Sequence, residues 1–212
     1  HNLNFFNEDI HLLFYFLFLL IIFFVFLNFE NNFSELFLSL TSSISNVGFS
    51  LNNSPNNLSF VFLILVIIGG SFFSTSSGIR FLKIYSLFKY SINEILSYSR
   101  PKNIYINKHL FSKDSFKLDE IYKYFLSVIV FIISLLILTF LLTLSGIDFE
   151  SSFKLSILTI MNTVNSSMFG LSDFSFYDLH FMTKYYLIFF MIVGRLELLT
   201  LLIICKKFLF KN

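Results

Sequence analysis

Four long apolar runs limit this chain to folds that a lipid bilayer can solvate. They begin near Ile10, Leu58, Tyr124 and Tyr185, and a small polar stretch interrupts the second after Ile68. A helix needs about 17–25 apolar residues to cross the hydrocarbon core, and the uninterrupted runs meet that length. Only 13% of the 212 residues are charged, whereas an average soluble domain carries roughly 25%. The sequence therefore predicts an all-α integral membrane protein.

Composition and charge argue against several other classes of protein. The net charge of +2 is too small to indicate a polyanion partner, so we expect no nucleic-acid binding. Cys205 is the single cysteine, which excludes a disulfide framework and a cysteine-based metal site. The four histidines are scattered and show no metal-ligand spacing. Ser71 could act as an intramembrane nucleophile, but no histidine lies within a span to activate it, so we expect no enzyme.

The same order of elements occurs twice along the chain. In each half a long span is followed by a segment too short to cross a bilayer, Ser34–Ile44 or Ser151–Met161, then by a polar loop and a second span. Such a segment is typical of a re-entrant helix, with an amphipathic surface helix as the alternative. A shift of 117 positions places Ser45–Gly48 on Asn162–Asn165. This repetition is typical of transport proteins.

Basic residues predict the orientation of the chain in the membrane. They gather in the linker over 91–120 and in the C-terminal tail, whereas residues 28–57 have none and residues 145–181 have only Lys154. The positive-inside rule then places the linker and the C-terminus in the cytoplasm and both short helices outside. We therefore expect one unit over 1–90, the cytoplasmic linker over 91–120, and a second unit with the tail over 121–212.

The polar loop after the first short segment has chemistry suited to a dehydrated cation. Irregular backbone at membrane depth is tolerated only where it lines water or protein. Gly48 permits a positive φ, which can aim successive carbonyls toward one axis. A ring of such carbonyls can replace the hydration shell of a monovalent cation. The short helix would also point its partly negative C-terminal end toward the same place.

Three motifs occur in an order that resembles a known family. They are Asn46-Val47-Gly48-Phe49, the interrupted helix from Ile68 to Arg80, and Gly194-Arg195-Leu196-Glu197. Together they resemble the C-terminal half of the Trk/Ktr/HKT superfamily of potassium transporters, in particular the bacterial TrkH membrane subunits. The resemblance covers nearly the whole chain, and Gly-Arg-Leu-Glu is its most specific element.

The resemblance implies a potassium-channel-like fold in which four span–pore helix–span units surround one pore. This sequence would supply the third and fourth units, with the second span of the third unit broken by an intramembrane loop. Because the sequence begins at His1 and not at Met, we expect a C-terminal fragment of a longer chain. The N-terminal half of that chain would then supply the first two units.

The resemblance also implies which residues form the selectivity filter. One quarter would be Ser45, Asn46, Val47, Gly48 and Phe49, and another would be Asn162, Thr163, Val164, Asn165 and Ser166. Potassium, the substrate, would bind their backbone carbonyls, with no covalent cofactor. Asn165 stands where the family has glycine. Asparagine tolerates the left-handed region best among non-glycine residues, which favours the same backbone path, but its side chain leaves potassium-over-sodium selectivity open.

A gate below the filter is the second implied site. Its loop would contain Gly69, Gly70, Ser71, Phe72, Phe73, Ser74, Thr75 and Gly78. The family places Arg195 beside this loop. A lone arginine facing lipid costs at least about 2.5–3.5 kcal/mol, so Arg195 needs a cavity or a partner. A purely structural pair with loop carbonyls is the alternative to an ion-contacting role.

The leading prediction is passive or coupled potassium uptake by a multi-pass protein of the bacterial inner membrane. The resemblance implies a homodimer and a TrkA-like cytoplasmic nucleotide-binding regulatory subunit as partners, besides the bilayer. Two alternatives stay open: a non-conducting scaffold with a degraded filter, and a transporter that selects poorly between potassium and sodium.

Overall fold

The computed structural model is all-helical over the residues that it describes, which are 7–27, 33–50, 58–69, 79, 81–98, 118–171, 175–177 and 179–195. The α-helices are α1 (Asn7–Leu27), α2 (Phe33–Ile44), α3 (Ser59–Ile68), α4 (Phe81–Ser97), α5 (Leu118–Leu144), α6 (Phe149–Met161) and α7 (Phe181–Arg195). A short 3₁₀ helix, η3, covers Ser167–Phe169. These elements confirm the predicted all-α class.

Helix lengths follow the apolar runs of the sequence. Within α5, Ile121–Leu144 is a mostly apolar stretch of 24 residues, the one described stretch that is both long and apolar enough to cross a membrane. At about 1.5 Å per residue it is about 36 Å long, slightly more than the hydrocarbon core. Leu13–Val25 of α1 and Ser59–Ile68 of α3 are shorter apolar helices. The predicted continuation of the last span beyond Arg195 lies outside the described residues.

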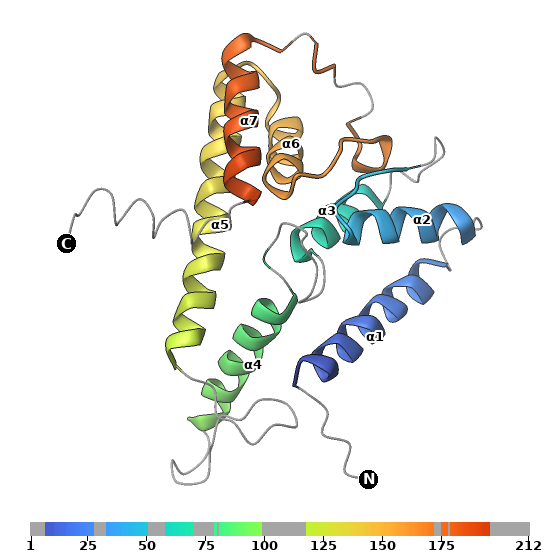
Figure 1. Ribbon diagram of the computed structural model, residues 1–212, viewed down its shortest axis with the longest axis vertical. Helices are drawn as coiled ribbons and strands as arrows, with labels where there is room; N and C mark the ends of the chain where they lie inside the picture. The colour runs from blue at the N-terminus through green and yellow to red at the C-terminus, as the bar shows by residue number, and fades with distance from the viewer. Residues whose placement is uncertain are drawn as a thin grey trace, which may run out of the picture.

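The helices pack in two groups, which are joined through α3 and through the contact of α4 with α5. Figure 1 shows α5, α6 and α7 close together, and α6 packs against both of its neighbours. In the other group α1 packs against α2, while α4 packs against α5. Helix α3 contacts both short helices, α2 and α6. This position of α3 brings the ends of the two short helices near each other.

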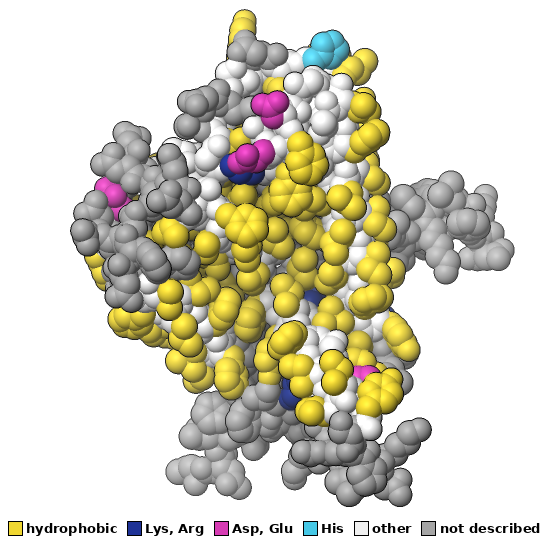
Figure 2. All heavy atoms as spheres, turned by 180° about the vertical axis from the view of Figure 1, so that it is seen from behind, with side chains coloured by type: hydrophobic (Ala, Val, Ile, Leu, Met, Phe, Trp, Pro, Cys, Tyr) yellow, Lys and Arg dark blue, Asp and Glu magenta, His cyan; other side chains and the backbone are white. Residues whose placement is uncertain are grey.

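Apolar side chains fill the centre of the molecule and also cover its outside. Phe62 and Val66 of α3, Leu138 of α5 and Leu158 of α6 are buried in one cluster. On the outside, α5 exposes Ile132, Ile133, Leu136, Ile137 and Phe140. Figure 2 shows apolar side chains over most of the described part of one face, with few charges among them. So large an apolar surface indicates contact with lipid or with further protein.

The two short helices each bury a set of hydroxyl groups. Ser39, Ser42 and Ser43 of α2 and Ser152, Ser156 and Thr159 of α6 are buried. Several of them donate to a carbonyl one turn earlier, for example Ser156 Oγ to Ser152 O at 2.7 Å and Thr159 Oγ1 to Leu155 O at 2.7 Å. These bonds satisfy the hydroxyls that make them within the helix, as a dry environment requires, whereas Ser42 Oγ has no hydrogen-bond partner among the described residues.

The second predicted span is divided as the sequence indicated. Helix α3 ends at Ile68 and α4 begins at Phe81. Helix α4 continues to Ser97 and α5 already begins at Leu118, so both ends of the linker predicted over 91–120 are helical. Residues 99–117 of that linker lie outside the described part of the chain.

Candidate functional site

The loops that follow α2 and α6 lie against each other. The Val164 amide donates to the Val47 carbonyl at 3.2 Å. The hydroxyls of Ser50 and Ser167 are 3.1 Å apart. Both pairs are separated by 117 residues, which is the shift that relates the two halves of the sequence. The structure therefore brings together the two segments that the sequence pattern singled out.

Helices α2 and α6 end in the same hydrogen-bonded motif. After α2, Val47 N donates to Ser42 O at 3.0 Å; after α6, Thr163 N donates to Leu158 O at 2.9 Å. The residues before these donors, Asn46 and Asn162, have φ of 57° and 56°. This is the Schellman arrangement, with asparagine at the left-handed position that glycine usually occupies.

The number of residues that separates matching positions of the two loops is not constant along them. The helix-ending bonds correspond at a separation of 116 residues, so Asn46 matches Asn162 there. The loop contacts correspond at 117. The second loop thus has one more residue between its helix and the contact at Val164. The predicted shift of 117, which places Ser45 on Asn162, equals the separation of the contacting residues, whereas the helix ends correspond at 116.

Gly48 is required by its backbone angle and by its neighbour. Its φ is 82°, a region that side chains with a Cβ rarely adopt. A Cβ at this position would also overlap the carbonyl oxygen of Val164 and lie 2.8 Å from the Val164 nitrogen. The close approach of the two loops therefore depends on the missing side chain.

Asn165, the counterpart of Gly48 at a shift of 117, has a different conformation. Asn46 and Asn162 are the non-glycine residues with positive φ in the described part of the chain, and Asn165 is not among them. Its side-chain amide donates to Leu171 O at 3.3 Å, so the side chain is held by the following segment. The expected glycine-like backbone at Asn165 is therefore wrong for this structure.

Uncharged oxygen atoms gather around the two loops. Several are buried side-chain oxygens with no hydrogen-bond partner among the described residues: Ser42 Oγ, Thr163 Oγ1, Asn165 Oδ1 and Ser166 Oγ. Beside the second loop is a cavity of about 310 Å³, lined by Leu155, Leu158, Thr159, Asn162, Thr163, Val164, Asn165, Phe176 and Met191. None of these lining residues is charged. Any cation held here would be bound by neutral oxygens.

The remaining predicted filter residues lie in the same place. Ser45 Oγ donates to Thr41 O at 2.8 Å, so its hydroxyl closes the last turn of α2. The side chains of Val47, Phe49 and Val164 are exposed. These three exposed apolar side chains lie in the loops after α2 and α6. They form a surface that contacts either water or other protein.

Helix α7 is fastened to the end of α6. The side-chain amide of Asn162 donates to Met191 O at 3.0 Å. Nearby, a Cβ on Gly194 would overlap the carbonyl oxygen of Ile160 and lie 2.9 Å from its carbon. The sequence predicted only a backbone role for Asn162 and no packing contact for Gly194. A glycine inside an apolar helix was the signal for such a contact.

The predicted gate residues are only partly described. Gly70, Ser71, Phe72, Phe73, Ser74, Thr75 and Gly78 lie outside the described residues. Gly69 follows α3 directly and accepts a hydrogen bond from the Tyr15 hydroxyl at 2.8 Å. Arg195 ends the described part of α7 and is exposed there. Tyr15 belongs to none of the motifs that the sequence displays, so its contact with Gly69 was not predicted.

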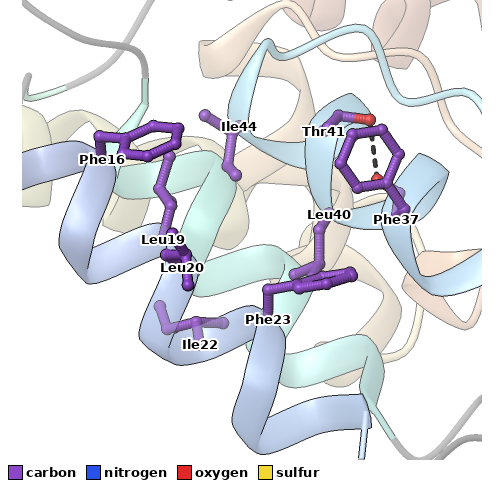
Figure 3. Close-up of a pocket in the computed structure, with 9 residues that line it drawn as sticks. All are labelled: Phe16, Leu19, Leu20, Ile22, Phe23, Phe37, Leu40, Thr41 and Ile44. Atoms are coloured by element: carbon purple, nitrogen blue, oxygen red, sulfur yellow. Dashed lines mark hydrogen bonds between the residues drawn. The ribbon is translucent and has the colours of Figure 1, made fainter. Parts of the chain in front are cut away.

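Other pockets and charges offer less chemistry. An apolar pocket of about 280 Å³ lies between α1 and α2, and Figure 3 shows the residues that line it. Its one polar lining residue, Thr41, donates to the carbonyls of Phe37 and Leu38. In α6, Lys154 Nζ pairs with Glu150 Oε1 at 2.6 Å, and this hydrogen bond lowers the pKa of the Glu150 carboxyl. Within the described residues no group of three or more His, Cys, Asp or Glu side chains could hold a metal ion.

Comparison with known proteins gives a family and a fold. The family model TrkH, described as a cation transport protein, matches residues 34–210. The crystal structure of the potassium transporter TrkH from Vibrio parahaemolyticus superposes with a TM-score of 0.77 at 22% identity, covering 93% of this chain and 43% of that one. The chain thus spans less than half the length of that transporter. No match was found among curated proteins.

The two roles of Asn162 can be separated by mutation. Asn162→Gly keeps the left-handed turn and removes the bond to Met191, which should lower stability by about 1 kcal/mol. Asn162→Ala removes both, and the left-handed alanine should cost about 1 kcal/mol more. Thermal unfolding of the detergent-solubilised protein should therefore rank the parent above the glycine variant and the glycine variant above the alanine variant. Equal midpoints for the two variants would contradict the left-handed role.

Proposed function

The chain belongs to the TrkH family of cation transport proteins, and we propose that it supplies the C-terminal half of a potassium-conducting pore. The observation that carries this proposal is the meeting of the two loops at the ends of α2 and α6, through the Val164–Val47 bond and the glycine contact at Gly48. Each loop lies at the partly negative C-terminal end of a short helix. Together with the uncharged surroundings, this favours a monovalent cation bound by neutral oxygens.

The helices divide into two proposed pore units. The first consists of α1, the pore helix α2, and α3 with α4; the second consists of α5, the pore helix α6, and α7. Residues Ser45–Phe49 and Asn162–Ser166 would form two quarters of a selectivity filter. The N-terminal half of the longer protein would supply the other two quarters. This arrangement agrees with the chain's coverage of 43% of the Vibrio transporter.

Other parts of the proposal follow from the family. We place the protein in the bacterial inner membrane as a multi-pass homodimer, with the linker and the C-terminus in the cytoplasm and a TrkA-like nucleotide-binding subunit beneath it. The loop Gly69–Gly78 would gate the pore, with Arg195 as its partner. Passive and coupled uptake both fit this design.

A second candidate function is cation uptake with little preference between potassium and sodium. The conformation of Asn165 favours it, because this residue lacks the positive φ that Gly48 has. Unequal backbone at equivalent filter positions would give a less regular ring of carbonyls.

Rubidium uptake by the full-length protein in potassium-deficient cells tests the main proposal, and the protein should support such uptake.

Gly48→Ser in the same protein tests the proposed filter. The serine Cβ would overlap the Val164 carbonyl, so the variant should lose most of its potassium preference while still inserting. Gly146→Ser is the matched control, because Gly146 also has a positive φ, 89°, but a Cβ there would meet no atom within 4 Å. Unaltered selectivity in Gly48→Ser with normal expression would contradict the filter assignment.

Asn165→Gly tests the second candidate. If the asparagine lowers discrimination, the glycine variant should raise the potassium-to-sodium permeability ratio several-fold. Asn165→Ala separates the causes, because it removes the side chain without granting the left-handed backbone. A rise in both variants would assign the effect to the side chain, and a rise in glycine alone to the backbone. A ratio unchanged in both would show that Asn165 does not affect the ions.

Arg195→Ala tests the gate. A planar guanidinium offers five donors for carbonyls of a broken helix, and lysine offers only a compact charge. We therefore expect Arg195→Ala and Arg195→Lys each to raise flux without a regulatory subunit. Lys184 also lies on α7, and its Nζ donates to Tyr177 O at 3.1 Å. Lys184→Ala therefore controls for the loss of a positive charge on that helix. Parental flux in both Arg195 variants would leave Arg195 a structural residue.

A further inference from the structure

The chain leaves α3 and returns to α4 at nearly the same point. The Ile79 amide donates to the Ile67 carbonyl at 3.4 Å, so the two ends of the intervening segment are hydrogen-bonded to each other. Gly69 is buried with φ 68° and ψ −166°, a combination that is essentially restricted to glycine. We call Ile67, Gly69, Ile79 and Phe81 the neck.

Tyr15 of α1 contacts both sides of this neck. Its hydroxyl donates to the Gly69 carbonyl at 2.8 Å. Its ring centroid is 5.1 Å from that of Phe81, the first residue of α4, at an interplanar angle of 50°. Tyr15 is only 7% exposed, so both contacts are made in a dry environment. Tyr15 thus joins the end of α3 to the start of α4.

The hydroxyl of Tyr15 supplies a hydrogen-bond donor to a buried backbone carbonyl. Gly69 follows the end of α3 at Ile68 and is buried, and its carbonyl accepts from the Tyr15 hydroxyl. A buried carbonyl without a donor is costly in apolar surroundings. Phenylalanine would fill the same space but could not donate a hydrogen bond to that oxygen. In a chain with 33 Phe and 10 Tyr, the tyrosine on this apolar helix has a role that the neighbouring Phe14, Phe16 and Phe18 cannot supply.

We propose that Tyr15 is a positioning residue that holds the neck in place and thereby sets the rate of ion passage. The effect on ion passage rests on the proposed function, in which residues 69–78 gate the pore. Tyr15 lies on a different helix from the loops at Val47 and Val164, and neither of its contacts involves them. It should therefore affect the rate of transport and leave ion binding at those loops unchanged.

Tyr15→Phe in the full-length protein tests the proposal, because it removes one hydroxyl and keeps the ring. Hydrogen–deuterium exchange should show the Ile79 amide exchanging about fivefold faster, as expected for the loss of one hydrogen bond of about 1 kcal/mol. Rubidium uptake should show a higher maximal rate per molecule, by about twofold or more, with an unchanged KM.

Phe18→Leu is the matched control. Phe18 also packs on Phe81, with ring centroids 5.8 Å apart, but it has no hydroxyl to donate to the Gly69 carbonyl. This variant should keep the parental exchange rate at Ile79 and the parental maximal rate. An equal effect of both variants would assign the result to packing and overturn the role of the hydroxyl.

The two proposals fail in different ways. Parental exchange at Ile79 in Tyr15→Phe would overturn the positioning role, whatever the transport data show. An unchanged maximal rate in a conducting protein would overturn the link between the neck and ion passage. A parent protein without any rubidium uptake would overturn the proposed function, and the exchange experiment would still decide the role of Tyr15.

Discussion

Backbone hydrogen bonding where helices stop is the constraint on which this structure depends. In apolar surroundings, a helix that ends leaves carbonyls that water cannot reach. Here α2 and α6 close their ends with bonds from Val47 and Thr163 back to Ser42 and Leu158. Helix α3 stops at Ile68, and the hydroxyl of Tyr15 supplies the donor for the next carbonyl. Each of these helices therefore ends where a specific donor pairs with a free carbonyl. The candidate filter follows the ends of α2 and α6, and the candidate gate follows the end of α3.

Close backbone approach is the second recurring feature. Gly48 lets one loop contact Val164, and Gly194 lets α7 contact the carbonyl of Ile160. Helices in lipid gain little from the hydrophobic effect between them, so tight van der Waals contact and interhelical hydrogen bonds must hold them together. The bond from Asn162 to Met191 is one such link. It connects the end of a proposed pore helix to the helix that carries Arg195.

The family membership explains why the described surface is so apolar. The half-pore that we propose would expose both the face that meets lipid and the face that meets the rest of the protein. Val47, Phe49 and Val164 are exposed at the loops, where the proposed N-terminal units would complete the ring. The outer face of α5 exposes Leu136, Ile137 and Phe140, as a lipid-facing helix does.

Several features could be predicted from the sequence: the helical class, the interruption of the second apolar run after Ile68, the two short helices, and the suitability of glycine at position 48 for a positive φ. These follow from apolar periodicity, chain length and steric limits on φ, which act over a few neighbouring residues. Three features could not be predicted in this way: Asn165 lacks the positive φ of Gly48, the helix ends are offset by one residue from the loop contacts, and Tyr15 contacts Gly69 from 54 residues away. These features depend on which atoms of distant segments approach one another. The hydropathy of successive residues reports burial and secondary structure, and it does not specify such contacts.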